Sequence, residues 1–338
     1  MFRVTTWGES HGPALGAVID GCPAGLSITN NDFRAELARD VPDLNLGTPR
    51  GEKNRFEVLS GIFAGKTLGT PISIIIWNND ARPESYEVGR DTLRPGHADF
   101  TWLARFGHTD YRGGSRASGR ECIARLAAGA VARRLISTVG VTVSGDLIEL
   151  AGIPITGDAS RKAARDEALR LGETGESTGG ILEVRIKGVP AGVGCPVFGK
   201  LQAELGQAFL TIGGVKALEY GSGFQAARST GSAQNDPFTL SADGNAVLAG
   251  NICGGLLGGI STGGEIIFRL AVKPTPTIPI PQKTVNVALK QAVVMKYRGR
   301  FDLNFAPRVL PIAEAMASIV VADQLIRAGE LHPARMRE

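Results

Sequence analysis

Glycine is the feature that most constrains how this chain can fold. Of its 338 residues 45 are glycine, which is about twice average usage. The glycines fall in short clusters with no three-residue period, which excludes a collagen-like or low-complexity chain. Because glycine adopts left-handed backbone conformations without strain, we expect many tight turns and close backbone contacts. The remaining composition, 43% hydrophobic and 21% charged, is that of a globular protein and excludes global disorder.

Charge and cysteine usage restrict the partners and the compartment. The net charge is +4 and aromatic residues make up only 6%, so we expect neither nucleic acid nor a membrane surface as a main partner. The longest uncharged run, between Asp243 and Glu265, is broken by asparagines and glycines and is interpreted as buried glycine-rich backbone. Four scattered cysteines predict no disulfide framework and no zinc site. With no visible signal peptide, these features indicate a cytoplasmic protein.

Hydrophobic patterning predicts a mixture of strands and helices. Strand-like runs rich in β-branched residues cover residues 71–77, 139–150, 181–187 and 265–272. Helical spacing covers residues 31–40, 121–136, 159–171, 198–210 and 311–328, the last with Pro311 in its first turn. The elements do not alternate as in a doubly wound sheet, so the pattern predicts an α+β fold.

Two short echoes suggest an internal repeat. G-C-P-A-G at residues 21–25 matches G-V-P-A-G at residues 188–192, and residues 59–65 resemble residues 257–263. The order of the two echoes predicts pseudo-equivalent halves, roughly 1–137 and 138–338, although a glycine-rich chain also produces such matches by chance. Because no linker of Pro/Ser/Gly composition separates the halves, we expect one merged domain.

Two motifs match functional patterns without the context that those patterns require. Residues 8–12 read G-E-S-H-G, but a nucleophile elbow needs a preceding strand and an earlier oxyanion loop, and position 10 leaves room for neither. A serine hydrolase is therefore a minor alternative. Residues 221–226 read G-S-G-F-Q-A, but no long helix follows, so we interpret them as a tight glycine turn.

The residues best suited to chemistry lie on glycine- and proline-rich loops. His11 is flanked by glycines, and His97 lies in R-P-G-H-A-D at residues 94–99, so both can be reached by a ligand. An isolated histidine of this kind is more often bonded to a backbone carbonyl. Arginines interleaved with glycines at residues 112–125, just before a helix, favour an anion site over a solvated basic face. No acid or cysteine spacing completes a metal site.

Several segments taken together resemble the chorismate synthase family, in the right order and over nearly the whole chain. They are residues 2–12 (FRVTTWGESHG), 94–99 (RPGHAD), 110–114 (DYRGG), 125–130 (RLAAGA), 258–263 (GGISTG), 273–275 (KPT), 299–302 (GRFD) and 311–316 (PIAEAM). The resemblance implies a β-α-β sandwich with an internal pseudo-two-fold repeat, assembled as a homotetramer.

The implied activity is that of a carbon–oxygen lyase. Phosphate is lost from 5-enolpyruvylshikimate-3-phosphate by anti-1,4 elimination to give chorismate, with bound reduced FMN and no net redox change. Arginines suit a substrate with one phosphate and two carboxylates, and the flavin supplies the difficult chemistry. Since no appended reductase segment is visible, we expect NADPH to act only indirectly, through an external flavin reductase.

The resemblance also assigns roles to individual residues. The implied catalytic residues are His11, beside the departing phosphate, His97, at the flavin pyrimidine edge, and Asp302, which tunes flavin N5 and relays the C6 proton. The implied substrate-binding residues are Arg94, Arg120, Arg300, Ser10, Arg39 and Arg50. The implied FMN-binding residues are Arg116, Ala117, Ser118, Gly213, Gly214, Gly258, Lys273, Pro274, Thr275, Pro276, Thr277 and Arg300. His108 is expected to be structural.

This chain departs from the family pattern in one region that bears on substrate binding. Family members usually carry a run of arginines near residue 40, where this chain has Arg39, Asp40 and Val41; Arg50 and Arg55 are the nearby candidates to substitute. The departure favours an alternative, a non-catalytic homologue that binds flavin or a phosphorylated metabolite. Retention of the whole acid–base set argues for the enzyme. Smaller departures are Ala117, Gly119 and Phe301.

Overall fold

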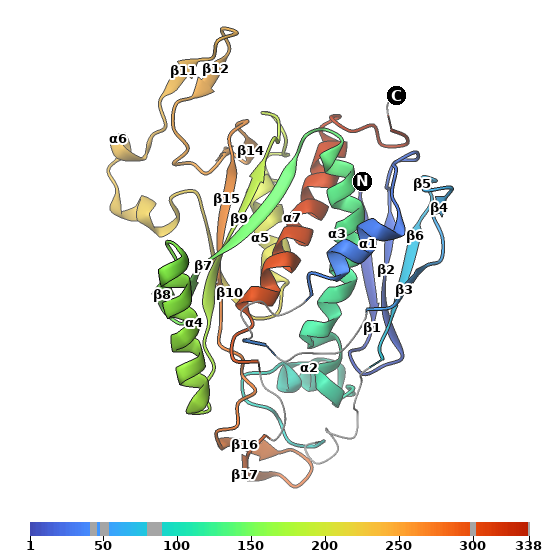
Figure 1. The fold of residues 1–338 in the computed structure, drawn as a ribbon, viewed down its shortest axis with the longest axis vertical. Helices are drawn as coiled ribbons and strands as arrows, with labels where there is room; N and C mark the ends of the chain where they lie inside the picture. The colour runs from blue at the N-terminus through green and yellow to red at the C-terminus, as the bar shows by residue number, and fades with distance from the viewer. Residues whose placement is uncertain (41–45, 48–53, 80–89, 298–301, 337–338) are drawn as a thin grey trace.

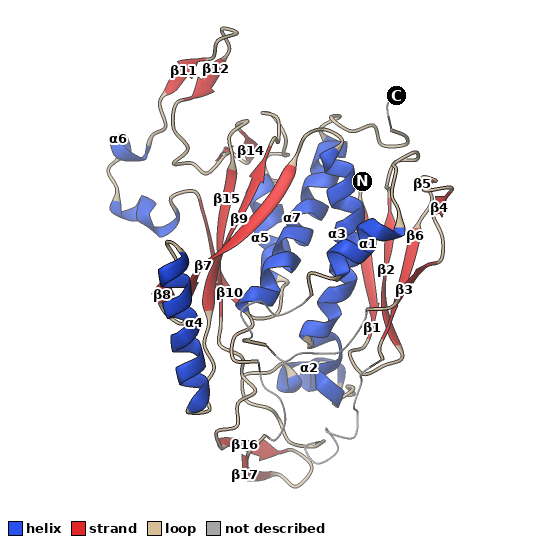
Figure 2. Ribbon diagram, in the orientation of Figure 1, coloured by secondary structure: helices blue, strands red, loops and turns tan. Residues whose placement is uncertain are grey.

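The computed structural model describes residues 1–40, 46–47, 54–79, 90–297 and 302–336. Two antiparallel sheets lie on either side of a layer of helices (Figures 1 and 2), which confirms the α+β sandwich. One sheet has the order β1 (Arg3–Gly8), β2 (Ala14–Asp20), β6 (Ile72–Trp77), β3 (Phe56–Val58). The other has the order β10 (Val215–Tyr220), β15 (Ile266–Val272), β9 (Gly180–Lys187), β7 (Thr142–Leu150), β8 (Ile153–Pro154).

The remaining elements fill or surround this sandwich. The inner helices are α1 (Asn30–Leu37), α3 (Cys122–Ser137), α5 (Leu201–Leu210) and α7 (Ala306–Arg327). The others are α2 (Asp99–Phe106), α4 (Asp158–Glu173), α6 (Gly231–Gln234) and the 3-10 turns η3 (Arg112–Ala117), η4 (Gly119–Glu121) and η5 (Gly223–Arg228). Four hairpins complete the chain: β4–β5 (Ile62–Phe63, Lys66–Thr67), β11–β12 (Phe238–Leu240, Ala246–Leu248), β13–β14 (Leu256–Leu257, Ile260–Ser261) and β16–β17 (Gln282–Asn286, Gln291–Met295).

Each sheet buries one face against the helices. Ile72, Ile74 and Ile76 alternate with more exposed residues along β6, and Phe268 and Leu270 do the same on β15. This period of two is expected of antiparallel strands with one covered face. It produces a single apolar core that contains residues from both sheets and from the helices between them.

The two central helices, α3 and α7, pack side by side at unusually close range. A Cβ added to Gly129 would lie 2.5 Å from the Cβ of Ala315, so only glycine allows this approach. Both helices begin at the lower end of the molecule in Figure 1 and run upward together. Their amino-terminal ends, which carry partial positive charge, are therefore brought together with the loops that precede them.

A buried hydroxyl braces the first half of the chain. Thr67 Oγ1 donates a hydrogen bond to the carbonyl of Pro23 at 2.6 Å and accepts one from the amide of Leu26 at 3.0 Å. Thr67 is only 3% exposed, so this hydroxyl satisfies two backbone groups that water cannot reach.

The same brace recurs in the second half. Ser261 Oγ donates to the carbonyl of Pro190 at 2.6 Å and accepts from the amide of Val193 at 2.9 Å. The two prolines belong to the two copies of the glycine–proline motif, and Thr67 and Ser261 end the hairpins β4–β5 and β13–β14. The second sequence echo is in a different register, because it pairs Ile62 in the first strand of one hairpin with Ile260 in the second strand of the other. The sheet orders β1-β2-β6 and β7-β9-β15 match as well. The predicted internal repeat is therefore present in the fold.

The structure corrects three of the expectations for local structure. Helix α7 begins at Ala306, so Pro311 lies inside it rather than in its first turn, where Pro307 lies. Strand β1 does precede the G-E-S-H-G motif, although β2 follows it and not the helix of a nucleophile elbow. The uncharged run between residues 243 and 265 is not buried throughout, because its first part contains β12, the second strand of the exposed hairpin β11–β12.

Helix α7 is long and apolar enough to cross a membrane by length and composition. Most of the apolar window that meets this criterion is buried within the sandwich, and the helix forms the centre of the core.

Among the residues that the structure describes, no cluster of histidine, cysteine, aspartate and glutamate could hold a metal ion.

The paired hydroxyl braces give a test of the repeat. We expect Thr67→Val and Ser261→Ala each to lower the unfolding free energy by about 3 kcal/mol, because each leaves a buried carbonyl and amide unsatisfied. The double variant should lose the sum to within about 0.5 kcal/mol, since the two braces share no partner. Urea denaturation measures both quantities. Thr67→Ser and Ser261→Thr keep the hydroxyl and serve as controls; an equal loss in these controls would contradict a hydrogen-bonding role.

Candidate active site

Five loop segments converge at the end of the sandwich where α3 and α7 begin (Figure 1). They are residues 8–12, 94–99, 110–121, 273–279 and 302–305. Three of these lie in the first half of the chain and two in the second half, so the site is built jointly by the two halves.

His97 joins the loops of residues 94–99 and 273–277. Its Nδ1 lies 2.9 Å from the carbonyl oxygen of Pro95 and its Nε2 lies 2.9 Å from Thr277 Oγ1. Because a carbonyl can only accept, Nδ1 carries the proton and the Thr277 hydroxyl donates to Nε2. Burial, and then the charge of Arg94, lower the pKa of His97 to about 4. The ring is therefore neutral at physiological pH.

Lys273 makes a second link between the same two loops. Its Nζ donates to the carbonyl of Gly96 at 2.6 Å, and burial, followed by the charge of Lys216, lowers its pKa. Gly96 has φ +72°, and a Cβ there would lie 2.7 Å from the Cβ of Pro276. Glycine at this position allows the two loops to pack directly against each other.

Arg94 is held rigidly by Asp99. Two side-chain hydrogen bonds of 2.8 and 2.7 Å join the guanidinium to the carboxylate, and the amide of Arg94 donates a third at 2.9 Å. Although burial raises it, the pKa of Asp99 is lowered overall by these bonds and by the charge of Arg94. This pair fixes a planar cation at the edge of the site.

His11 and Arg94 lie on either side of two consecutive glycines. A Cβ on Gly113 would lie 2.1 Å from His11 Cε1, and one on Gly114 would lie 3.2 Å from Arg94 Nη2. Both glycines are left-handed, with φ of 59° and 84°. His11 Nδ1 lies 3.0 Å from the hydroxyl of Ser10. These glycines therefore let the loop of residues 110–121 press against the imidazole and the guanidinium together.

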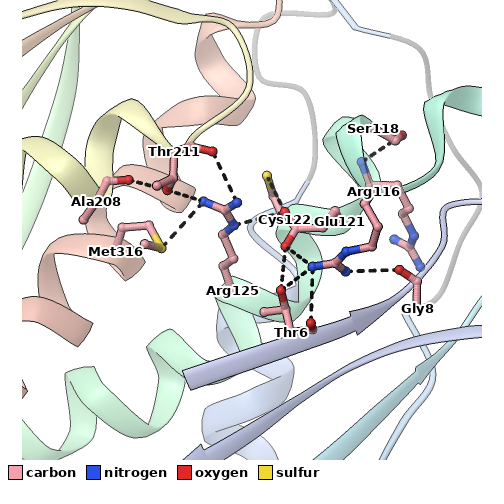
Figure 3. Close-up of polar contacts among 11 residues, drawn as sticks. Thr6, Gly8, Arg116, Ser118, Glu121, Cys122, Arg125, Ala208, Thr211 and Met316 are labelled. Carbon is pink, nitrogen blue, oxygen red and sulfur yellow. Dashed lines mark hydrogen bonds and ion pairs between the residues drawn. The ribbon is translucent and has the colours of Figure 1, made fainter. Parts of the chain in front are cut away.

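Arg116 connects strand β1 to the start of α3. Its guanidinium donates to the carbonyl of Gly8 at 3.1 Å and to Thr6 Oγ1 at 2.6 Å, and it pairs with Glu121 at 3.1 Å. Glu121 also pairs with Arg125 at 3.0 Å, as Figure 3 shows. Arg116, which the sequence predicts to bind the cofactor, thus has a clear structural role.

Arg120 lies deep in the site, with its side chain 1% exposed. It donates to Asn54 Oδ1 at 2.8 Å and to Asn78 Oδ1 at 3.2 Å, and it lies 3.6 Å from Asp40. Asp40 in turn pairs with Arg308 at 3.0 Å. The acidic residue that departs from the family pattern therefore bridges two arginines at the starts of α3 and α7.

Arg39 is held in an ion-pair network between helices. Its guanidinium lies 3.0 Å from Glu36 and 2.5 Å from Glu314, and both acids also pair with Arg133. This network ties α1, α3 and α7 together. Arg50 and Arg300, the other predicted substrate ligands, lie outside the described residues.

The predicted flavin-binding residues are only partly brought together. Gly213 and Gly214 lie by the 273–277 loop, where the amide of Lys273 donates to the carbonyl of Gly214 at 2.9 Å. Ser118 Oγ accepts from the amide of Arg120 at 3.3 Å, and Ala117 beside it is exposed. Gly258 lies in the β13–β14 turn, at the opposite end of the molecule from α2 in Figure 1.

Asp302 lies beside the last part of the 273–279 loop. It lines a cavity of about 110 Å³ together with Ser177, Ile278 and Pro279. Ser177 Oγ donates to the carbonyl of Thr275 at 2.6 Å. Asp302 and the end of the 273–279 loop therefore line the same cavity.

Several supporting residues were not predicted from the sequence. Asp99 holds Arg94, and Asn54 and Asn78 hold Arg120. Asn78 also donates to the carbonyls of Glu9 and Gly12, which fixes the His11 loop. A polar residue directly after the apolar strand at residues 72–77 was the available signal for Asn78.

Comparison with known proteins agrees with this geometry. The chorismate synthase family profile matches residues 2–326. Chorismate synthase of Methanosarcina acetivorans is 46% identical, covering 100% of this chain and 98% of its own length. That of Methanothermobacter thermautotrophicus is 47% identical, covering 98% and 94%. A chorismate synthase crystal structure superposes with a TM-score of 0.77 at 28% identity, covering 96% of this chain and 92% of its own.

These matches extend over the segments that carry His11, His97 and Asp302 and over both halves of the sandwich. The chain therefore belongs to the chorismate synthase family.

Proposed function

We propose that this chain, as a member of the family, eliminates phosphate from 5-enolpyruvylshikimate-3-phosphate to form chorismate. The observation that carries the proposal is that His11 and Arg94 meet the same pair of glycines, while His97 is bonded to the 273–277 loop. The enzyme is a carbon–oxygen lyase. A substrate with one phosphate and two carboxylates suits a site lined by arginines and by the amino-terminal ends of two helices, which carry partial positive charge.

The site fits a reduced flavin, and we propose that the flavin is FMN. Thr275 Oγ1 is buried, and none of the described residues gives it a hydrogen-bond partner. A buried hydroxyl without a hydrogen-bond partner destabilises the folded protein unless a bound ligand supplies that partner. Lys273, Thr275 and Thr277, together with Gly213 and Gly214, are the residues that would hold the cofactor. When bound, reduced FMN supplies transient electron donation toward the breaking C–O bond.

The roles of the protein side chains follow from their environments. His11, paired with Ser10, is positioned to give a proton or a hydrogen bond to the departing phosphate. His97 is neutral and both of its ring nitrogens are bonded within the protein, so it fixes Thr277 and the loop that would hold the cofactor. Asp302, at the wall of the cofactor loop, accepts the substrate proton. Arg94 and Arg120 stabilise substrate anions.

Further proposals concern the surroundings of the enzyme. Residues 1–338 form one domain of two halves, about 1–137 and 138–338. We propose a cytoplasmic location, because all four cysteines are free thiols, which suits a reducing compartment. Reduced FMN comes from an external flavin reductase, with NADPH as the indirect reductant.

We also propose a homotetramer. Large apolar side chains are exposed at Phe198 (97%), Phe238 (71%) and Leu240 (71%), and the β11–β12 hairpin projects away from the body in Figure 1. Burying such side chains against other copies removes apolar area from water.

Turnover tests the function directly. We expect the protein with chemically reduced FMN, under anaerobic conditions, to release chorismate and phosphate in equal amounts from 5-enolpyruvylshikimate-3-phosphate. His11→Ala and Asp302→Ala should lower kcat by about 10²–10⁴-fold, as loss of a proton-transfer group does. Chorismate absorbance and a phosphate assay follow the two products.

The matched control is His108→Ala, which removes an exposed histidine and should leave kcat unchanged. Flavin binding without either product would favour the non-catalytic homologue instead. Ester hydrolysis that needs no flavin and is lost in Ser10→Ala would favour the serine hydrolase alternative.

The neutral state of His97 predicts a pH-dependent stability. Its folded pKa of about 4 lies below the unfolded value of about 6.5. As the pH falls from 6.5 to 4, His97 becomes protonated in the unfolded chain but stays neutral in most of the folded protein. The free energy of unfolding therefore decreases. The stability advantage of wild type over His97→Gln should therefore shrink by about 3 kcal/mol between pH 7 and pH 4. Urea denaturation at several pH values measures it; a constant difference would show that His97 is not buried as described.

Assembly is tested by light scattering on the eluted protein. We expect a mass four times that of the 35.5 kDa chain. Replacing Phe238 and Leu240 together with serine should shift the protein toward smaller species, because the hairpin then loses its apolar contacts. A monomer in the wild type would contradict the tetramer without touching the assignment of the reaction.

A further inference from the structure

Tyr297 brings an unused hydroxyl to the edge of the site. Its Oη is buried, and none of the described residues is within hydrogen-bonding reach of it. The charged groups that act on its pKa are Arg94 and Asp99, the same pair that forms the fixed cation at the rim. No role for this residue follows from the family resemblance.

The fold connects Tyr297 to the loop that carries Arg94. Tyr297 follows strand β17, and its partner strand β16 is bonded to the segment that precedes Arg94. Thr284 Oγ1 donates to the carbonyl of Leu93, and the amide of Leu93 donates to the carbonyl of Val285 at 3.2 Å. The hairpin and the Arg94 loop are therefore one connected unit, and Tyr297 is held in place by the backbone.

The phenol offers a proton to whatever binds next to it. Burial raises the pKa of Tyr297 to about 12, while the charge of Arg94 lowers it and that of Asp99 raises it by smaller amounts. The hydroxyl is therefore protonated at neutral pH. A buried hydroxyl without a partner destabilises the folded protein. A ligand that supplies the missing acceptor removes this destabilisation, and functional sites often carry such local instability.

We propose that Tyr297 donates a hydrogen bond to an anionic oxygen of a ligand bound at Arg94. The chemistry is shared by two sources, a carboxylate or phosphate of the substrate and the phosphate of FMN. Arg94 supplies the charge and Tyr297 supplies direction, so the tyrosine is a binding residue that sets the orientation of the anion. This inference rests on the proposed function.

Tyr297→Phe tests the proposal, with Tyr220→Phe as the matched control, since Tyr220 is 40% exposed. Two dissociation constants are measured, that of FMN and that of 5-enolpyruvylshikimate-3-phosphate in the presence of oxidised FMN, so that no turnover occurs. The melting temperature of the ligand-free protein is recorded for each variant.

Loss of one hydrogen bond to an anion should weaken binding of its source by roughly 10- to 100-fold. A loss for the substrate alone identifies a substrate anion, and a loss for FMN alone identifies the cofactor phosphate. The ligand-free Tyr297→Phe protein should melt no lower than wild type, because only an unsatisfied hydroxyl has been removed.

Two results would overturn the inference. Unchanged affinity for both ligands would show that the hydroxyl meets neither, and a lower melting temperature without ligand would show that it has a partner within the protein. If wild type itself neither binds nor converts the substrate, the proposed function fails. A normal wild type with a normal Tyr297→Phe variant refutes the role of Tyr297 alone.

Discussion

The close contact between α3 and α7 determines where everything else in this protein can lie. With glycine at position 129 packed on Ala315, the two helices run together through the core. Each helix belongs to a different half of the chain and covers a different sheet, so their contact joins the halves into one body. Since both helices start at the same end, the loops before them meet there, and those loops carry the arginines and histidines.

The two halves share a scaffold but supply different chemistry. The hydroxyl braces at Thr67 and Ser261 show that the halves fold by the same local rules. The first half provides His11, Arg94 and His97, whereas the second provides the 273–279 loop and Asp302. Neither half contains a complete site, and this explains why the functional residues are scattered along the sequence. It also explains why so many glycines are needed: each close approach, as at Gly96 and Gly113, joins one loop to another.

Much of this architecture could be predicted from the sequence. A run of β-branched residues identified β6, and the alanine-rich helical spacing identified α3, because both patterns are local. The start of α7 could not be identified, since its first amide is held by the side chain of Asn304 at 2.8 Å, before two prolines that suggested a later beginning. Pro311 lies inside the helix, a position that proline usually disfavours because it lacks an amide hydrogen and its ring meets the carbonyl four residues earlier.

The site was predictable in its parts and not in its connections. Arg94, His97 and Arg120 stand in recognisable motifs, but their states depend on partners distant in sequence. The tautomer of His97 is set by the carbonyl of Pro95 nearby, but its second nitrogen is bonded to Thr277, 180 residues away, and the charge around Arg120 is set by Asp40. A sequence pattern near residue 40 indicates only that an acid stands where arginines are usual. The fold shows that this acid ties Arg120 to Arg308.

The bonds that join the loops of residues 94–99 and 273–277 have a consequence for the order of folding. His97 and Thr277 are 180 residues apart, and Lys273 and Gly96 are 177 apart. Contacts of such long range form only after the chain between them has become compact, since closing a long loop costs entropy that later contacts must offset. The sheets and helices of each half can therefore form early, while the binding end is completed only when the halves dock. A refolding chain would regain its helical signal before it regains any affinity for its ligands.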